Sequence, residues 1–266
     1  MRDNIKEQCE YLLMYLGHTF FMLCFWMGTF FLFLFQTIMT LLLKKLRHLK
    51  VLHQMNRIGV ESFNIIVLTG LFTGMVFALQ TYIGFQRVGG EQFIGAVVAL
   101  GMIRELGPVL SGLMVTGRAC SAIAAEIGTM RITEQLDALT TLRIDPFQYL
   151  IVPRIMASTV IMPFLTIFSM IFGIVGGYVV CTYILQLSPE EYQNSILTYV
   201  EMSDIVSGLI KAAVFGFILA WVGCFKGFYT RGGAYGVGLA TTESVVQSSI
   251  MILIANYFLT KILEHL

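Results

Sequence analysis

Three ionisable side chains lie inside long apolar segments of this 266-residue chain. Arg104 and Glu105 follow the start of one apolar run at Gln92 by about a dozen residues, and Lys211 lies early in another run. An unpaired charge at such a depth in a membrane costs at least about 2.5–3.5 kcal/mol. An arginine can hold a phosphate through two parallel hydrogen bonds, and a lysine acts as a compact point charge. The three residues are therefore candidates to contact a head group or a permeating solute.

The alternative for these residues is structural, because a Glu–Lys or Glu–Arg pair can hold two helices together. Pro108 adds a second signal, since proline has no N–H to donate to the carbonyl four residues earlier, that of Arg104. That carbonyl is freed and the helix can kink there. Charge and opened backbone thus fall at one depth, which favours an internal polar site as the default interpretation.

The composition indicates the environment in which such a site must work. The chain is 57% hydrophobic and 12% charged, whereas ordinary globular chains carry roughly 25% charged residues. An all-α integral membrane protein is the expected fold class. Seventeen basic and sixteen acidic residues give a net charge of +1, which argues against a nucleic-acid partner. The five cysteines form no CxxC pair and the four histidines are scattered, so we expect no metal and no cofactor.

Five apolar runs are long enough to cross a bilayer core, which needs roughly 20 residues per helix. A sixth stretch, residues 11–43, has no Asp, Glu, Lys or Arg, and it either spans the membrane or is embedded in it from one face. We expect an N-terminal membrane-embedded segment, residues 1–56, and a domain of five transmembrane helices, residues 57–266. The five predicted spans are Gly59–Gln86, Gln92 to about Glu126, Ile155–Pro189, Ile205–Phe225 and Ser244–Thr260.

The distribution of Lys and Arg predicts the orientation, because cytoplasmic loops carry an excess of both. Ten basic residues fall in the loops 44–57, 127–154 and 226–236, whereas the loops 84–92 and 186–204 and the tail hold two. The first three loops are therefore expected in the cytoplasm and the C-terminus outside, in the periplasm.

Other residues in the spans favour structural roles. Arg118 and Glu126 are eight residues apart, so they lie on nearly one helix face toward the cytoplasmic end, where pairing or anchoring is expected. Small residues at helical spacing allow close contact between helices in lipid. Such stripes are Gly117, Ser121 and Ala125 in the second span, and Gly173, Gly176 and Gly177 in the third.

The cytoplasmic loop 127–154 contains a periodic segment. Apolar residues recur at i, i+4 and i+7, which predicts a short amphipathic helix that ends before Asp145-Pro146. Its polar face is acidic, which argues against attraction to anionic lipid and favours a protein partner. The apolar positions are Ile132, Leu136, Leu139 and Leu142 or Arg143, and the polar ones are Glu134, Gln135, Asp137 and Thr141.

No nucleotide-binding or hydrolase motif is present: the sequence contains no GxxxxGK[ST], no HExxH and no GxSxG. The chain is therefore not expected to be an enzyme. Any energy for transport would come from another subunit or from an ion gradient.

Three stretches carry a family resemblance. They are RELGPVLSGLMVTGRACSAIAAEIGTMRITEQLDAL (104–139), GLIKAAVFG (208–216) and GFYTRGGAYGVGLATTESVV (227–246). On these residues the chain resembles the MlaE/YrbE-type permeases, the membrane subunits of MCE-associated ABC transporters that move phospholipids and related lipids. The resemblance extends from about Arg57 to the end of the chain.

The resemblance implies a homodimer whose subunits each have five transmembrane helices and an N-terminal membrane-embedded helix. It also implies two cytoplasmic ATP-binding subunits and a periplasmic MCE-domain protein as partners, and a bacterial inner membrane as the location. Arg104, Glu105 and Lys211 match the polar contacts around the family's lipid site. The coupling helix that contacts the ATPase would hold Ile132, Glu134, Gln135, Leu136, Asp137 and Leu139.

The expected function is therefore that of a permease subunit that moves phospholipids between the inner membrane and the MCE-domain protein, in outer-membrane lipid asymmetry or lipid homeostasis. The alternative is a gradient-driven secondary transporter or ion channel with Glu105 as its proton or ion site. The absence of visible inverted repeats weighs against that alternative. A third possibility is a scaffold for a periplasmic complex.

Overall fold

The computed structural model describes residues 2–43, 48–87 and 89–263, and their side chains from Phe21 onward except Leu23. All regular elements in these ranges are helices, which confirms the all-α fold class. The chain divides into two compact units, Met1–Lys45 and Leu46–Leu266. Three basic residues of the first predicted cytoplasmic loop and one cysteine side chain lie outside the described part: Lys44, Lys45, Arg47 and Cys9.

The N-terminal unit is one unbroken helix, α1 (Arg2–Leu43). Its part Cys24–Leu43 is long and apolar enough to cross a membrane. An entering-and-returning hairpin requires a turn inside the segment, so this form of the embedded alternative is wrong. With α1 the described residues contain six candidate spans, one more than the five predicted spans that follow the N-terminal segment.

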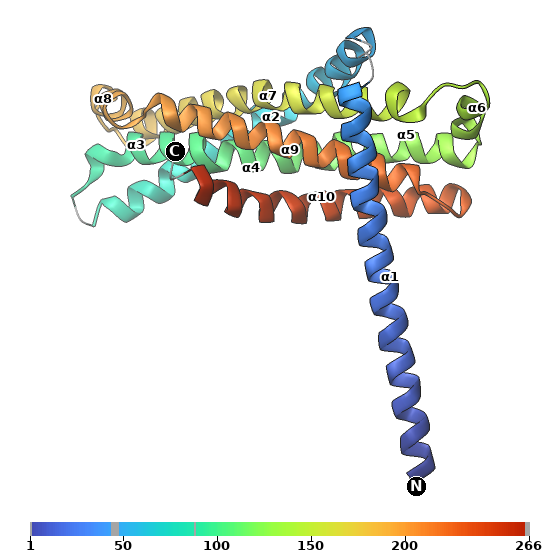
Figure 1. Ribbon diagram of the computed structural model, residues 1–266. Coiled ribbons are helices and arrows are strands. Elements are labelled where there is room, and N and C mark those ends of the chain that lie inside the picture. Colours follow the sequence, from blue (N-terminus) through green and yellow to red (C-terminus); the bar gives the residue numbers. More distant parts are fainter. Residues whose placement is uncertain (1, 44–47, 88, 264–266) are drawn as a thin grey trace. The chain divides into compact units, whose positions relative to one another are not determined.

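The second unit is a bundle of long helices (Figure 1). Two spans, Glu91–Ile132 and Phe147–Ile184, each join several elements end to end, because π-helical turns interrupt the α-helix without ending the span. The α-helices are α2 (His48–Phe85), α3 (Ile94–Gly101), α4 (Gly107–Val115), α5 (Ser121–Ile132), α6 (Gln135–Thr141), α7 (Val152–Val179), α8 (Pro189–Tyr199), α9 (Met202–Phe228) and α10 (Gly233–Leu263). The other elements are the 3₁₀ turn η1 (Glu91–Phe93) and the π-helical turns η2 (Met102–Leu106), η3 (Thr116–Cys120), η4 (Phe147–Ile151) and η5 (Val180–Ile184).

Helices α2 and α7 pack at backbone contact distance. A Cβ added at Gly74 would overlap the carbonyl oxygen of Gly173, and one added at Gly176 would overlap that of Leu71. The small residues of the third predicted span therefore serve in helix packing, as the sequence predicted. Because glycine has no side chain, the two backbones approach closely and make dispersion contacts with each other. Such packing is a main source of helix association in lipid.

Two short helices lie at opposite ends of the bundle, α6 at one end and α8 at the other (Figure 1). The sequence analysis did not predict α8, which lies in the acidic loop 186–204. Buried Tyr192 fixes it, because its hydroxyl donates to the carbonyl oxygen of Ile174 over 3.1 Å. Burial raises the pKa of this hydroxyl, so it stays protonated and able to donate.

The predicted helix in the cytoplasmic loop is shorter than expected. Ile132 is the last residue of α5, and Glu134 has a left-handed backbone (φ 59°) that turns the chain into α6. The prediction that both belong to one amphipathic helix is therefore wrong, because the reversal between α5 and α6 breaks the periodicity. Leu136 is buried as predicted, whereas Leu142 lies beyond the helix and is 70% exposed.

Several long helices also extend past the apolar runs that predicted them. Helix α2 begins at His48, eleven residues before Gly59, and η4 starts the third span at Phe147 instead of Ile155. Charged residues mark the edge of the apolar layer but do not end a helix, so charge-free runs underestimate helix length.

Candidate functional site

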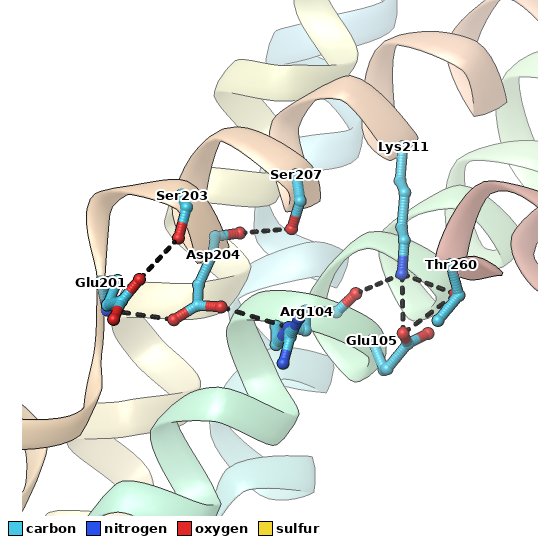
Figure 2. A network of polar contacts seen from close by, with 8 residues as sticks. All are labelled: Arg104, Glu105, Glu201, Ser203, Asp204, Ser207, Lys211 and Thr260. Carbon is cyan, nitrogen blue, oxygen red and sulfur yellow. Dashed lines mark hydrogen bonds and ion pairs between the residues drawn. The ribbon is translucent and has the colours of Figure 1, made fainter. Parts of the chain in front are cut away.

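The turn η2 positions the first two candidate residues in the second span. Gly107 N donates to the carbonyl of Met102, five residues back, which makes this turn π-helical. Pro108 cannot donate to the carbonyl of Arg104, and that oxygen instead accepts a hydrogen bond from the Lys211 ammonium over 2.9 Å. The carbonyl that the sequence predicted to be free is thus bonded to the third candidate residue (Figure 2).

Lys211 is 2% exposed and has all its donors satisfied. Besides the Arg104 carbonyl, its Nζ donates to Glu105 Oε1 over 2.6 Å and to Thr260 Oγ1 over 2.8 Å. An ammonium group has three donors. Lys211 therefore has no N–H left to donate to a ligand. It would influence a bound ligand through its positive charge and through its hydrogen bond to Glu105.

Glu105 receives hydrogen bonds from two further side chains of α10. Asn256 Nδ2 donates to its Oε2 over 2.9 Å, and Thr260 Oγ1 lies 3.1 Å from its Oε1. Asn256 and Thr260 are four residues apart and thus adjacent on one helix face. Both carboxylate oxygens accept hydrogen bonds, yet the Glu105 side chain is 38% exposed. Glu105 therefore lies at the solvent-accessible edge of the network.

Arg104 is held on the other side by Asp204. Arg104 Nε lies 3.2 Å from Asp204 Oδ1, and Asp204 Oδ2 accepts the backbone N–H of Glu201 over 3.0 Å. The second contact belongs to a capping box that starts α9. Asp204 thus ties the position of Arg104 to the beginning of α9, while the arginine side chain stays 46% exposed.

Three of the four charged groups line one pocket of about 430 Å³, and the fourth, Asp204, contacts it through Arg104. Arg104, Glu105 and Lys211 lie in its wall with apolar neighbours. The other lining residues are Phe77, Val97, Leu100, Gly101, Ser207, Thr260 and Leu263. This combination suits an amphipathic molecule, with a polar part at the charges and an apolar part against the aromatic and aliphatic wall.

The charges of the site balance, with two cations and two carboxylates. Arg104 has the greatest capacity to bind a ligand, because only its Nε is bonded to a carboxylate and its two terminal nitrogens have no hydrogen bond to any described residue. An arginine can present two parallel N–H donors to a phosphate. The geometry therefore supports anion binding at Arg104, with the Glu105–Lys211 pair beside it.

A second group of charges lies at the end of the bundle near α6. Glu126 forms ion pairs with Arg57 of α2 and, over 3.0 Å, with Arg154 of α7. Arg118 pairs with Glu61. The structural role predicted for Arg118 and Glu126 is confirmed, but each forms ion pairs with residues of other helices and the two do not pair with each other.

The six predicted coupling residues fall on and before α6. Glu134, Gln135 and Asp137 are exposed, and Asp137 Oδ1 accepts a hydrogen bond from Arg131 over 2.9 Å. Leu136 anchors the helix and Leu139 is half-buried, whereas Ile132 ends α5. An acidic surface on a short anchored helix is thus presented at this end of the bundle.

Three residues of the site were missed by the sequence analysis: Asp204, Asn256 and Thr260. Asp204 counted as one of four acids in a loop, and the other two are uncharged residues in an apolar span. The available signal for the last two was their i, i+4 spacing in a segment of otherwise apolar residues.

Fold and site together define a multi-pass helical membrane protein with an internal, charge-lined pocket suited to an amphipathic molecule. The family model of the permease MlaE matches residues 51–262, which is most of the chain. The chain belongs to the MlaE permease family, a family of ABC transporter permeases, and contains every candidate residue within the matched region.

Curated relatives agree with this assignment. The chain is 47% identical over 235 residues to a "Probable ABC transporter permease protein" of Rickettsia conorii, which covers 88% of this chain and 91% of the relative. It is 43% identical to a protein of the same description from Synechocystis, over 85% and 86% of the two chains. It is 39% identical to the "Intermembrane phospholipid transport system permease protein MlaE" of Haemophilus influenzae, over 79% and 81%.

Proposed function

We propose that this permease moves phospholipids between the bacterial inner membrane and a periplasmic MCE-domain protein. The observation that carries the proposal is the pocket in which Arg104 presents two terminal nitrogens, bonded to no described residue, beside the Glu105–Lys211 pair and an apolar wall. The head-group phosphate binds Arg104, and the acyl chains lie against residues such as Phe77 and Leu100. The printed name of the Haemophilus relative, a phospholipid transport permease, supports this substrate class.

Two cytoplasmic ATP-binding subunits supply the energy, as befits an ABC permease, and two copies of the chain form the transporter. In this proposal the α6 end faces the cytoplasm and the C-terminus the periplasm, as the Lys and Arg count predicts. Membership of an ABC permease family argues against the gradient-driven alternative. Glu105, bonded to Lys211, Asn256 and Thr260, then serves as a fixed part of the pocket wall.

The substrate site is tested by replacing Arg104. We expect Arg104→Gln to lower the phospholipid that co-purifies in mild detergent about tenfold or more, because a hydrogen bond to a charged group contributes about 1.5–3 kcal/mol. Arg104→Lys should keep part of the binding, since it retains the charge but loses the two-donor geometry. Bound lipid is quantified by mass spectrometry of the purified protein.

The matched control is Arg87→Gln, which removes an exposed cation from the predicted periplasmic loop 84–92; Arg87 does not line the pocket. It should leave bound phospholipid unchanged. Full lipid occupancy in Arg104→Gln, together with full complementation of envelope lipid homeostasis, would contradict the site assignment.

The coupling role of α6 is tested by charge reversal. Glu134→Lys with Asp137→Lys should abolish co-purification of the ATP-binding subunit, because both carboxylates lie on the exposed face. The same reversal at Glu190 and Glu191 on α8, at the opposite end of the bundle, should leave that subunit bound. Stoichiometric ATPase in the α6 variant would refute the coupling surface.

A further inference from the structure

A second cleft lies near the α6 end of the bundle, between the beginning of α2 and the beginning of α7. Its volume is about 250 Å³. It shares no lining residue with the pocket at Arg104. The lining residues are Leu49, Lys50, His53, Gln54, Tyr149, Leu150, Pro153 and Arg154.

The ionisable groups of this cleft other than the Tyr149 phenol are basic: Lys50, His53 and Arg154. Lys50 lies over the ring of Tyr149, which positions its ammonium group against the wall. No aspartate or glutamate is among the lining residues. Glu126, which pairs with Arg154, also pairs with Arg57, so one negative charge faces two guanidinium groups.

Arg154 is the buried part of this basic group, with a side chain only 7% exposed. Its Nη1 donates to the carbonyl of Leu150 over 3.0 Å and its Nη2 to Glu126 over 3.0 Å. Its Nε has no hydrogen-bond partner among the described residues. Arg154 thus contributes a positive charge to the wall of the cleft, and this charge is only partly balanced by Glu126.

The surroundings of the cleft are apolar and accessible. Leu49 and Leu52, on the first turns of α2, are 83% and 60% exposed. Leu150 and Pro153 close the opposite side. An acyl chain attached to an anionic group in the cleft would thus find an apolar path along the outside of α2.

We propose that this cleft binds the phosphate of an anionic phospholipid from the cytoplasmic leaflet, as a site separate from the transport pocket. Basic pockets between membrane helices at the cytoplasmic side are suited to anionic head groups, and the inner leaflet supplies such lipids. The bound phosphate lies against Lys50, His53 and the Arg154 guanidinium. The lipid thereby joins α2 to α7 at the end that carries α6, and it is a resident lipid, not the transported one.

The test uses the full-length chain, purified in mild detergent, stripped of lipid and titrated with dioleoyl phosphatidylglycerol or dioleoyl phosphatidylcholine. Native mass spectrometry counts the lipids bound. Lys50→Gln should weaken phosphatidylglycerol binding about fivefold, the effect expected from one basic group near an anionic surface. Lys50→Arg should restore it, and phosphatidylcholine binding should be the same in all variants.

Two controls locate the effect. Arg231→Gln removes an exposed cation from the loop between α9 and α10, outside the cleft, and should leave phosphatidylglycerol binding intact. The loss caused by Lys50→Gln should also persist in an Arg104→Gln background, because the transport pocket does not contribute. An equal loss in Arg231→Gln, or no loss in Lys50→Gln, would overturn the proposal.

A final arm separates a lipid from a soluble anion. Inorganic phosphate at the concentration of the lipid should not displace phosphatidylglycerol, because only the lipid adds apolar contacts along α2. Displacement by phosphate alone would show that the cleft is a site for soluble phosphate and would overturn the lipid assignment.

Discussion

Replacing Gly74 in α2 with alanine is expected to prevent α2 and α7 from packing against each other. The added Cβ would overlap the carbonyl oxygen of Gly173 in α7, and neither backbone can move without separating the two helices along their contact. Overpacking in a well-packed interior typically costs about 1–3 kcal/mol and more where backbone is the obstacle. The yield of monodisperse protein in size-exclusion chromatography and its thermal unfolding midpoint should both fall sharply.

The matched control is Gly84→Ala, near the end of the same helix. No neighbouring atom lies within 4 Å of a Cβ built there. Alanine in a helix interior is favoured over glycine by about 0.5–1 kcal/mol, so this variant should be as stable as the parent or slightly more stable. Equal behaviour of the two variants would show that the contact between α2 and α7 is less close than described.

Replacing Lys211 with methionine is expected to have the second large effect. It leaves Glu105 without its counter-ion and the Arg104 carbonyl without its donor, inside an apolar layer. Removing one partner of a fully buried pair costs about 3–5 kcal/mol; because Glu105 is 38% exposed, we expect the lower end, about 3 kcal/mol, or a fall of about 6–12 °C in the unfolding midpoint. The measurement is thermal unfolding of the purified protein in detergent.

Glu105→Gln in the Lys211→Met background should recover much of that loss, because the uncompensated charge is gone and Gln keeps hydrogen-bonding capacity toward Asn256 and Thr260. Glu105→Gln alone leaves the buried Lys211 without its counter-ion, so this variant should also be less stable than the parent. Strict additivity of the two single effects would mean that the pair does not act as a unit.

The centre of the site could be predicted from the sequence because membrane depth makes a charge conspicuous. Arg104, Glu105 and Lys211 are rare groups in apolar runs, and Pro108 marks the opened carbonyl beside them. The structure brings all three together and satisfies the opened carbonyl with Lys211. A charged side chain inside a membrane must pair with another polar group, and the apolar spans contain few such groups.

The remainder of the site could not be predicted in the same way. Asp204 looks like a loop residue until α9 is seen to begin there, and its role depends on the capping box with Glu201. Asn256 and Thr260 are neutral, so no cost in lipid marks them as clearly. Their function depends on which face of α10 meets η2, a matter of long-range packing that a single sequence does not encode locally.

The helix ends show a similar division. Apolar runs locate the spans, but helix boundaries depend on hydrogen bonds in the loops, as at Glu134, where a left-handed residue ends the predicted periodicity. Helix α8 is short and largely polar, and it is held by Tyr192 and by its contact with Gly95 of α3. Its start was nevertheless marked in the sequence, by Pro189 as its first residue and by Glu190 and Glu191 in its first turn.

The π-helical turn η2 has a consequence for the length of the second span. Because Gly107 bonds to Met102, five residues back, this turn contains one residue more than an α-helical turn. Deleting one residue between Gly101 and Gly107 would remove this extra residue and restore an uninterrupted α-helix, with the two halves of the span facing nearly the same directions as before. The span can therefore lose one residue at this turn without re-orienting its other half, and the turn is the part of the pocket wall that holds Arg104 and Glu105.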